Sequence, residues 1–95
     1  MHTVELLERA LRAAEGLGYR VRQDWLDGPG AGCEIKGEKW LFLDLASSPL
    51  DQLDVVAGVL SRELGQRRGK DDATSHQPAP IDSAVQQFLD ERHAA

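Results

Sequence analysis

Cysteine and aromatic side chains are scarce in this chain. Cys33 is the single cysteine among 95 residues, so no disulfide can form within the chain, and a lone thiol is typical of a reducing compartment. The aromatic residues are two tryptophans, two phenylalanines and one tyrosine, and a chain of this length buries only about 60 to 65 % of its unfolded surface. We therefore expect a cytoplasmic protein with one modest core.

Positive charge is also in deficit. Eleven lysines and arginines stand against sixteen acidic residues, which gives a net charge of −5. Proteins that bind phosphates usually carry the opposite balance, so nucleic acid and anionic membrane are not expected as partners. No apolar run approaches the roughly 20 residues that span a bilayer, and the N-terminus lacks the pattern of a secretory signal. A soluble protein is expected.

Clusters of chemically active side chains are missing as well. Zinc sites need three or four converging ligands, whereas the histidines are dispersed along the chain at His2, His76 and His93. A nucleophilic serine needs a histidine base oriented by a carboxylate, and Ser47 has none nearby in the sequence. We predict no catalytic residue, no metal and no cofactor, so the chain is not expected to be an enzyme.

The first sixty-five residues show the periodicities of helices and strands. Apolar residues recur every three or four positions over residues 3–17, which is typical of an amphipathic helix. Residues 19–25 alternate between polar and apolar, which predicts a strand that turns Tyr19, Val21 and Trp25 toward a core. The apolar run of residues 40–45 is bounded by turn residues and predicts a central, buried strand.

A hairpin is predicted before this central strand. Glycine at the first position of a two-residue turn favours type II′, so the turn is placed at Gly37 and the residue after it. The resulting register pairs Cys33 with Phe42 and Ile35 with Trp40 on one face. We expect Cys33 to be packed there and Phe42 to belong to the core.

Two interruptions of the strand pattern allow an alternative interpretation. Asp44 breaks the apolar run and is expected on the surface at the open end of the strand. The glycine-rich stretch from Gly28 to Gly32 is interpreted as a turn or bulge between adjacent strands, because phosphate-binding loops lead into a helix and this one leads into a strand. The alternative function is a small enzyme with a site near Asp44, Ser47 and this loop.

A second helix and a tethered segment complete the chain. Ser48 is a predicted N-cap with Pro49 at the first helical position, and the apolar spacing continues to Gly65. Residues 66–80 are polar and contain two prolines, which is typical of a linker. Residues 81–95 are predicted to form a short amphipathic helix with the apolar positions Ile81, Val85, Phe88 and Leu89.

The order of these elements, together with Ser48, Pro49 and Gln52, resembles the N-terminal half of the ImmA/IrrE-like zinc metallopeptidases over residues 3–64. In that family the following helix carries His-Glu-x-x-His. This chain reads Val-Ala-Gly-Val-Leu-Ser-Arg-Glu-Leu over residues 56–64 and lacks both histidines. The resemblance therefore implies a shared scaffold and no peptidase activity carried over to any residue. It extends the alternative of a small enzyme near Asp44, Ser47 and the Gly28–Gly32 loop to a metal-free relative of these metallopeptidases.

The predicted fold class is α+β: residues 1–65 form a helix, a three-stranded antiparallel sheet with both helices on one face, and a second helix. The linker and the short C-terminal helix follow. The expected function is non-catalytic binding or regulation through a protein partner or self-association. The C-terminal helix is expected to dock reversibly on the apolar sheet face and to compete there with a partner. The residues expected to take part are Leu41, Leu43, Leu45, Ile81, Val85, Phe88 and Leu89.

Overall fold

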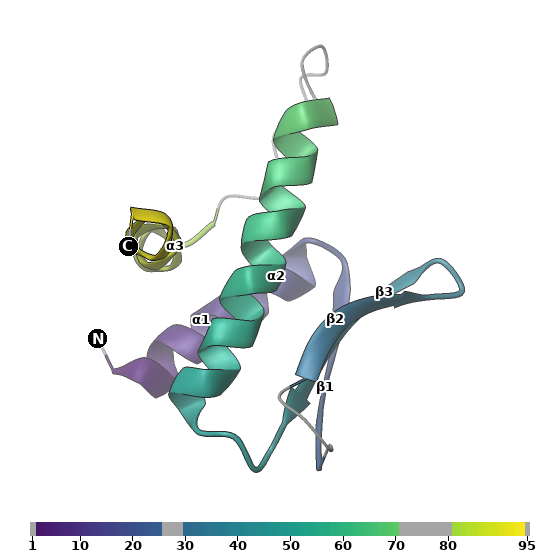
Figure 1. Ribbon diagram of the computed structural model, residues 1–95, viewed down its shortest axis with the longest axis vertical. Coiled ribbons are helices and arrows are strands. Elements are labelled where there is room, and N and C mark those ends of the chain that lie inside the picture. The colour runs from purple at the N-terminus through teal and green to yellow at the C-terminus, as the bar shows by residue number, and fades with distance from the viewer. Residues whose placement is uncertain (1, 26–29, 71–80, 95) are drawn as a thin grey trace.

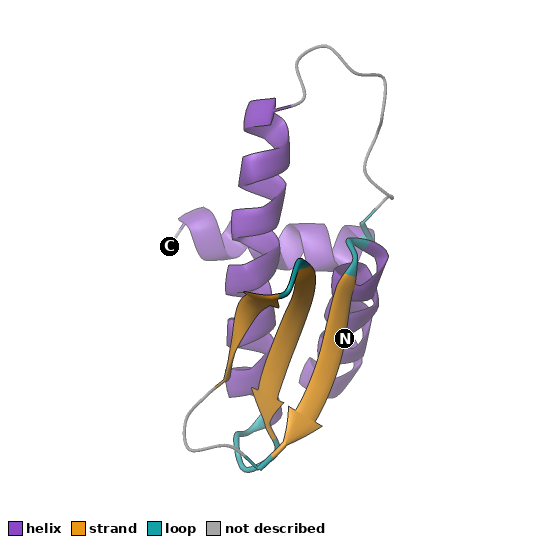
Figure 2. Cartoon of the chain, turned by 90° about the vertical axis from the view of Figure 1, so that its right-hand side faces the viewer, coloured by secondary structure: helices purple, strands orange, loops and turns teal. Residues whose placement is uncertain are grey.

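A computed structural model describes residues 2–25, 30–70 and 81–94 of the chain. In these ranges the chain belongs to the α+β class. Its elements are α1 (Thr3–Gly16), β1 (Tyr19–Asp24), β2 (Gly30–Ile35), β3 (Glu38–Asp44), α2 (Pro49–Lys70) and α3 (Ser83–Ala94). Figure 2 shows the three strands as one layer and the helices as a second layer behind it. One face of the sheet is therefore covered by helices.

The sheet is mixed, with the strand order β1-β3-β2. β3 runs antiparallel to β2 and parallel to β1. The predicted central position of β3 is confirmed, but the prediction of a fully antiparallel sheet is wrong. Asp24 at the end of β1 lies beside Asp44, and Gly30 at the start of β2 lies beside Leu43, so the connection crosses only one strand, about 10 Å. Because β1 and β2 can be joined across this short distance, β3, the most apolar strand, can lie between them.

The hairpin between β2 and β3 turns at Lys36 and Gly37. Both residues have positive φ angles, 53° and 81°, which is the signature of a type I′ turn. The predicted type II′ turn, one residue later, is wrong, and Cys33 pairs with Trp40 instead of Phe42. Because the partner of Cys33 moves by two residues, the strand alternation is preserved and the predicted residues still share a face.

The core lies between the sheet and the helices. Leu41 and Leu43 of β3 have 0 % exposed surface. They pack against buried side chains of the two long helices and of the residue after α1: Leu7, Ala10, Ala14, Leu17, Leu53, Val56, Ala57, Val59 and Leu60. A Cβ atom at Gly32 would lie 2.9 Å from Cγ2 of Val59. Glycine at this position therefore lets α2 approach the backbone of β2.

The start of α2 is confirmed and its end is not. The Ser48 hydroxyl accepts a hydrogen bond from the amide of Asp51 at 3.2 Å, and Pro49 is the first helical residue. The helix continues past Gly65 to Lys70. The glutamine, arginines and lysine after Gly65 favour helix and oppose the cost of roughly 1 kcal/mol for each of the two glycines in this stretch, Gly65 and Gly69. The predicted linker thus begins inside α2, and its residues 71–80 lie outside the described part.

The third helix packs on the helical layer. Figure 1 shows α3 end-on, with α2 between it and the sheet. The buried side chains of α3 are Val85 and Leu89, and Ile81 and Phe88 pack around them. The expectation that this helix covers the sheet face is therefore wrong. Its apolar side faces α1 and α2, which also supply its ion-pair partners.

Two ion pairs orient α3. The Asp82 carboxylate accepts a hydrogen bond from the Ala84 amide at 2.8 Å and one from Arg9 of α1 at 2.8 Å. The capping bond from Ala84, followed by the contact with Arg9, lowers the pKa of Asp82. At the other end, Arg92 donates two hydrogen bonds to Asp54 of α2, at 3.0 and 3.1 Å. These contacts fix the helix at both ends.

Candidate functional site

The structure divides the predicted interaction residues between the core and the surface. Leu41 and Leu43 lie in the core, so they cannot belong to an exposed sheet face. Leu45 follows β3 and is exposed. The apolar residues of α3 are already used within the chain, as described above. The face of the sheet that can meet a partner is therefore the opposite one.

This opposite face, here called the outer face, turns away from all the helices that the structure describes, and Figure 2 looks onto it. The strand registers place on it Arg20, Arg22, Cys33, Ile35, Trp40 and Phe42, together with Asp24, Ala31 and Glu38. Cys33 is exposed and Ile35 is 45 % exposed. Phe42 is only partly buried. The predicted packing of Cys33 and the core position of Phe42 are both wrong, because α1 and α2 cover the other face.

The centre of the outer face is an aromatic pair. Trp40 and Phe42 are two residues apart on β3, and their rings stack with centroids 5.7 Å apart and planes inclined by 10°. The guanidinium of Arg20 lies 5.7 Å from the Trp40 ring centroid and 3.4 Å from the Glu38 carboxylate. Stacking and the contact of the guanidinium with the ring therefore favour this arrangement.

A shallow hollow of about 420 Å³ lies beside the aromatic pair. It is lined by Arg22, Ile35, Lys36, Glu38, Trp40 and Phe42. Its lining combines three apolar side chains with three charged ones, Arg22, Lys36 and Glu38, here called the charged rim. Such a hollow can accept an apolar side chain while its rim contacts polar groups.

The charged rim extends along β1. Arg22 lies 3.3 Å from the Asp24 carboxylate, which also accepts a hydrogen bond from the Trp25 amide at 2.8 Å. The bond from the Trp25 amide, followed by that from Arg22, lowers the pKa of Asp24. Trp25 itself is 72 % exposed, so its predicted place in the core is wrong. β1 ends one residue before it, and its side chain therefore leaves the alternation of the strand.

The residues of the alternative enzyme site shape the turn after β3. Asp44 is buried, and its carboxylate accepts a hydrogen bond from the Ala46 amide at 3.0 Å. The predicted surface position of Asp44 is therefore wrong, and the hydrogen bond compensates its burial. The carbonyl of Ser47 accepts a bond from the Gln52 side chain at 3.0 Å, and Gln52 also accepts one from Gln23 of β1 at 3.3 Å. Gly28 and Pro29 lie outside the described residues.

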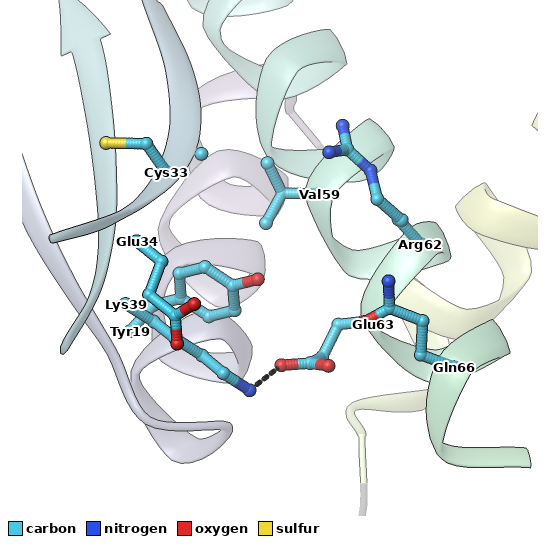
Figure 3. Close-up of a pocket in the computed structure, with 9 residues that line it drawn as sticks. Tyr19, Cys33, Glu34, Lys39, Val59, Arg62, Glu63 and Gln66 are labelled. Carbon is cyan, nitrogen blue, oxygen red and sulfur yellow. Dashed lines mark hydrogen bonds and ion pairs between the residues drawn. The ribbon is translucent and has the colours of Figure 1, made fainter. Parts of the chain in front are cut away.

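A groove opens between β2 and the C-terminal half of α2. Its volume is about 630 Å³, and it is lined by Tyr19, Gly32, Cys33, Glu34, Lys39, Val59, Arg62, Glu63 and Gln66 (Figure 3). The ammonium of Lys39 forms an ion pair with the carboxylate of Glu63 and lies 5.6 Å from the Tyr19 ring centroid. Glu63 is only 5 % exposed. One side of this groove is thus formed by a charge pair.

The groove was not found by sequence reasoning. One sequence feature could have indicated it. Lys39 on β3 and Glu63 on α2 carry opposite charges, and both occupy positions that the hydrophobic periodicity assigns to the buried face of their element. A charged residue on a buried face needs a partner of opposite sign. Only the fold shows that these two positions meet.

Comparisons with protein families, with curated proteins and with solved structures gave no match. The resemblance to the ImmA/IrrE-like metallopeptidases therefore stays a prediction that no comparison tests. In the described ranges, no three histidine, cysteine or acidic side chains gather in a way that could hold a metal ion. No helix in those ranges is both long and apolar enough to cross a bilayer.

Proposed function

We propose that this chain is a non-catalytic protein-binding module and that the outer face of its sheet binds a partner protein. The partner would place an apolar side chain in the hollow beside Trp40 and Phe42 and acidic groups around it. The observation that supports this proposal is the stacked aromatic pair on a sheet face that no described element covers. All three helices lie on the other side.

The composition of the outer face supports binding. Tryptophan and arginine are the residues that most often dominate the energy of protein interfaces. Arg20 and Arg22 have side chains that are 63 and 62 % exposed, and Lys36 stands at the rim. Arg20 pairs with Glu38 and Arg22 with Asp24 on the same face, so the outer face carries three cations against two acidic groups, a small positive excess in a chain of net charge −5. An acidic partner surface would therefore be steered toward this face.

The same charges disfavour self-association through the outer face. If two copies met through this face, each would bring the same small excess of positive charge, and like charges brought together in an interface are costly. We therefore propose a different protein as the partner. The exposed thiol of Cys33 is compatible with a reducing compartment, and the cytoplasm is the proposed location.

The test is a comparison of two matched charge reversals. Arg20→Glu changes the outer face, and Arg12→Glu makes the same change on an exposed position of α1. Partners are purified with the full chain as bait, and the affinity for the purified partner is then measured by calorimetry. We expect Arg20→Glu to weaken binding by about tenfold or more, roughly 1.4 kcal/mol, and Arg12→Glu to leave it unchanged.

Equal affinities for the two variants would contradict the proposal. So would turnover of esterase, peptidase or phosphatase substrates by the purified chain if that turnover were lost in Asp44→Asn. Circular dichroism on both arginine variants shows whether the fold is retained.

A further inference from the structure

The free edge of β2 borders the groove between β2 and α2. We propose that this groove binds an extended peptide segment of a partner protein, which adds as a fourth strand beside β2 and places a carboxylate against Arg62. The inference rests on the proposed role in protein binding, but it concerns a site separate from the aromatic pair of the outer face.

The first observation is the unpaired edge. β2 is the last strand in the order β1-β3-β2, and among the described strands it pairs only with β3. The backbone amides and carbonyls on its other side point away from the sheet. Such an edge is a template for a further strand, and main-chain hydrogen bonds then supply much of the affinity.

The two edges of the sheet differ in their protection. β1 carries three charged side chains in six residues, Arg20, Arg22 and Asp24, which is a common way to prevent strand addition. β2 reads Gly-Ala-Gly-Cys-Glu-Ile, with Glu34 as its only charged residue and no proline. The edge beside the groove is therefore the open one.

The groove has the shape for one added strand. Val59 of α2 contacts β2 at Gly32, whereas Figures 1 and 2 show the C-terminal half of α2 extending beyond the strands. Figure 3 shows Val59, Arg62 and Gln66 on the helix side of the groove and Glu34 on the strand side, while the sulfur of Cys33 points away from the helix. An added strand lies about 4.7 to 4.9 Å from its neighbour. It would thus run along β2 and below these three side chains.

The charged residues that line the groove indicate which peptide it can bind. Lys39 and Glu63 neutralise one another. Arg62 is exposed and makes no ion pair or hydrogen bond with the described residues, in a chain with an excess of acidic groups. It is therefore available for a carboxylate of the partner, and Glu34, of opposite charge, sets the direction of the peptide.

The spacing of Val59 and Arg62 adds a sequence rule. These residues are three positions apart on α2, which is a rise of about 4.5 Å. Side chains on the same face of a strand are two residues apart, about 6.6 Å. The reach of an arginine side chain covers this difference. The peptide should therefore have an apolar residue opposite Val59 and an aspartate or glutamate two positions from it.

A second copy of the chain does not fit this site. Packed helices lie about 8 to 10 Å apart, whereas two β2 strands paired edge to edge would be separated by about 4.8 Å. Since α2 packs directly on β2 at Gly32, the two α2 helices would approach too closely. An extended segment without a helix above it avoids this conflict.

The test selects peptides and then maps where they bind. A displayed library of random eight-residue peptides is panned on the full chain, and the strongest sequence is synthesised in three forms: unmodified, with its acidic residue changed to the amide, and with alternate backbone amides methylated. Amide exchange and nuclear magnetic resonance then locate each form. We expect slower exchange in residues 30–35, shifts in residues 59–66, and no binding of the methylated form.

The matched variants are Arg62→Gln and Arg12→Gln. Arg62→Gln should weaken binding of the unmodified peptide about two- to fivefold, the upper part of the range for an exposed ion pair, and should not alter binding of the amide form. Arg12→Gln should change neither. Selection of no peptide, equal binding of the methylated form, or shifts confined to Trp40 and Phe42 would overturn the inference.

The last of these outcomes would leave the proposed function intact, because the peptides would then bind the outer face. The reverse outcome is that the peptides slow amide exchange in β2 while Arg20→Glu leaves the affinity for every purified partner unchanged. That result would overturn the outer-face proposal and retain the groove. The two failures are therefore distinguishable.

Discussion

Truncation of two neighbouring residues of β3 should have very different effects on stability. Leu41 has no exposed surface and packs under both long helices. Replacing a fully buried leucine by alanine costs about 2 to 5 kcal/mol, the sum of lost transfer energy and the cavity that remains. Against a total stability of about 5 to 15 kcal/mol, Leu41→Ala should lower the melting temperature by roughly 8 to 40 °C, at about 4 to 8 °C per kcal/mol for a domain of this size.

Phe42→Ala should cost less, although phenylalanine is larger. The Phe42 ring is only partly buried. Its removal also ends the stacking with Trp40, a contact of about 0.5 to 1.5 kcal/mol. We expect about 1 to 3 kcal/mol in total, below the 3 to 5 of a buried aromatic truncation. The control is Leu45→Ala, an exposed site where the change should stay within about 0.5 kcal/mol.

Thermal and urea unfolding of the three variants decide the question. The expected order of destabilisation is Leu41→Ala, then Phe42→Ala, then Leu45→Ala. A larger loss for Phe42→Ala than for Leu41→Ala would mean that the helices cover the other face of the sheet, and the outer face would then not be the exposed one.

Three further perturbations test the packing of the chain. Gly30→Ala should be strongly destabilising in thermal melts, because φ is +97° and the new Cβ would lie against a carbonyl of β3, whereas Gly16→Ala, with open space around it, should be neutral or stabilising by up to about 1 kcal/mol. Gly32→Ala should cost about 1 to 3 kcal/mol by overpacking, and Val59→Ala in the same chain should recover part of it, a coupling that a double-mutant cycle measures. The pKa of Asp82 is lowered in the folded chain, so this residue contributes stability that is present above its ordinary pKa of about 4 and is lost as the pH falls through the lowered value. Below pH 4, the melting temperature should therefore fall less steeply with pH for Asp82→Asn than for the unchanged chain. Equal slopes would contradict the docking of α3.

Several local features of the fold could be predicted because they depend on short stretches of sequence. Ser48 and Pro49 define the start of α2 through side-chain capping and a fixed φ, and both are found in place. The alternation of β3 predicts a buried strand, and Leu41 and Leu43 are fully buried. Each of these inferences needs information from only a few neighbouring residues.

The strand order and the docking of α3 depend on distant contacts. Hydrophobic alternation identifies β3 as the central strand but does not set the direction of its neighbours, so the parallel pairing with β1 could not be derived. The position of α3 depends on the pairs of Arg9 with Asp82 and of Arg92 with Asp54, more than thirty residues apart in each case. Neither pair has a local sequence signal.

The candidate site was missed for a related reason. The pattern predicts two alternating faces on β3, and the sequence does not show which one the helices cover. The interaction surface was therefore assigned to Leu41 and Leu43, and the structure exposes Trp40 and Phe42 partly instead. The groove beside β2 depends on Gly32, whose missing side chain has no periodicity to detect.

The most direct test of the outer face is hydroxyl-radical footprinting of the full chain, alone and in complex with a partner purified from its native cell. We expect Trp40 and Phe42 to be labelled in the free chain and protected in the complex. Leu50, which is exposed on the first turn of α2, should be labelled equally in both. Protection of Leu50 together with unchanged labelling of Trp40 and Phe42 would contradict the proposal that the outer face is the binding surface.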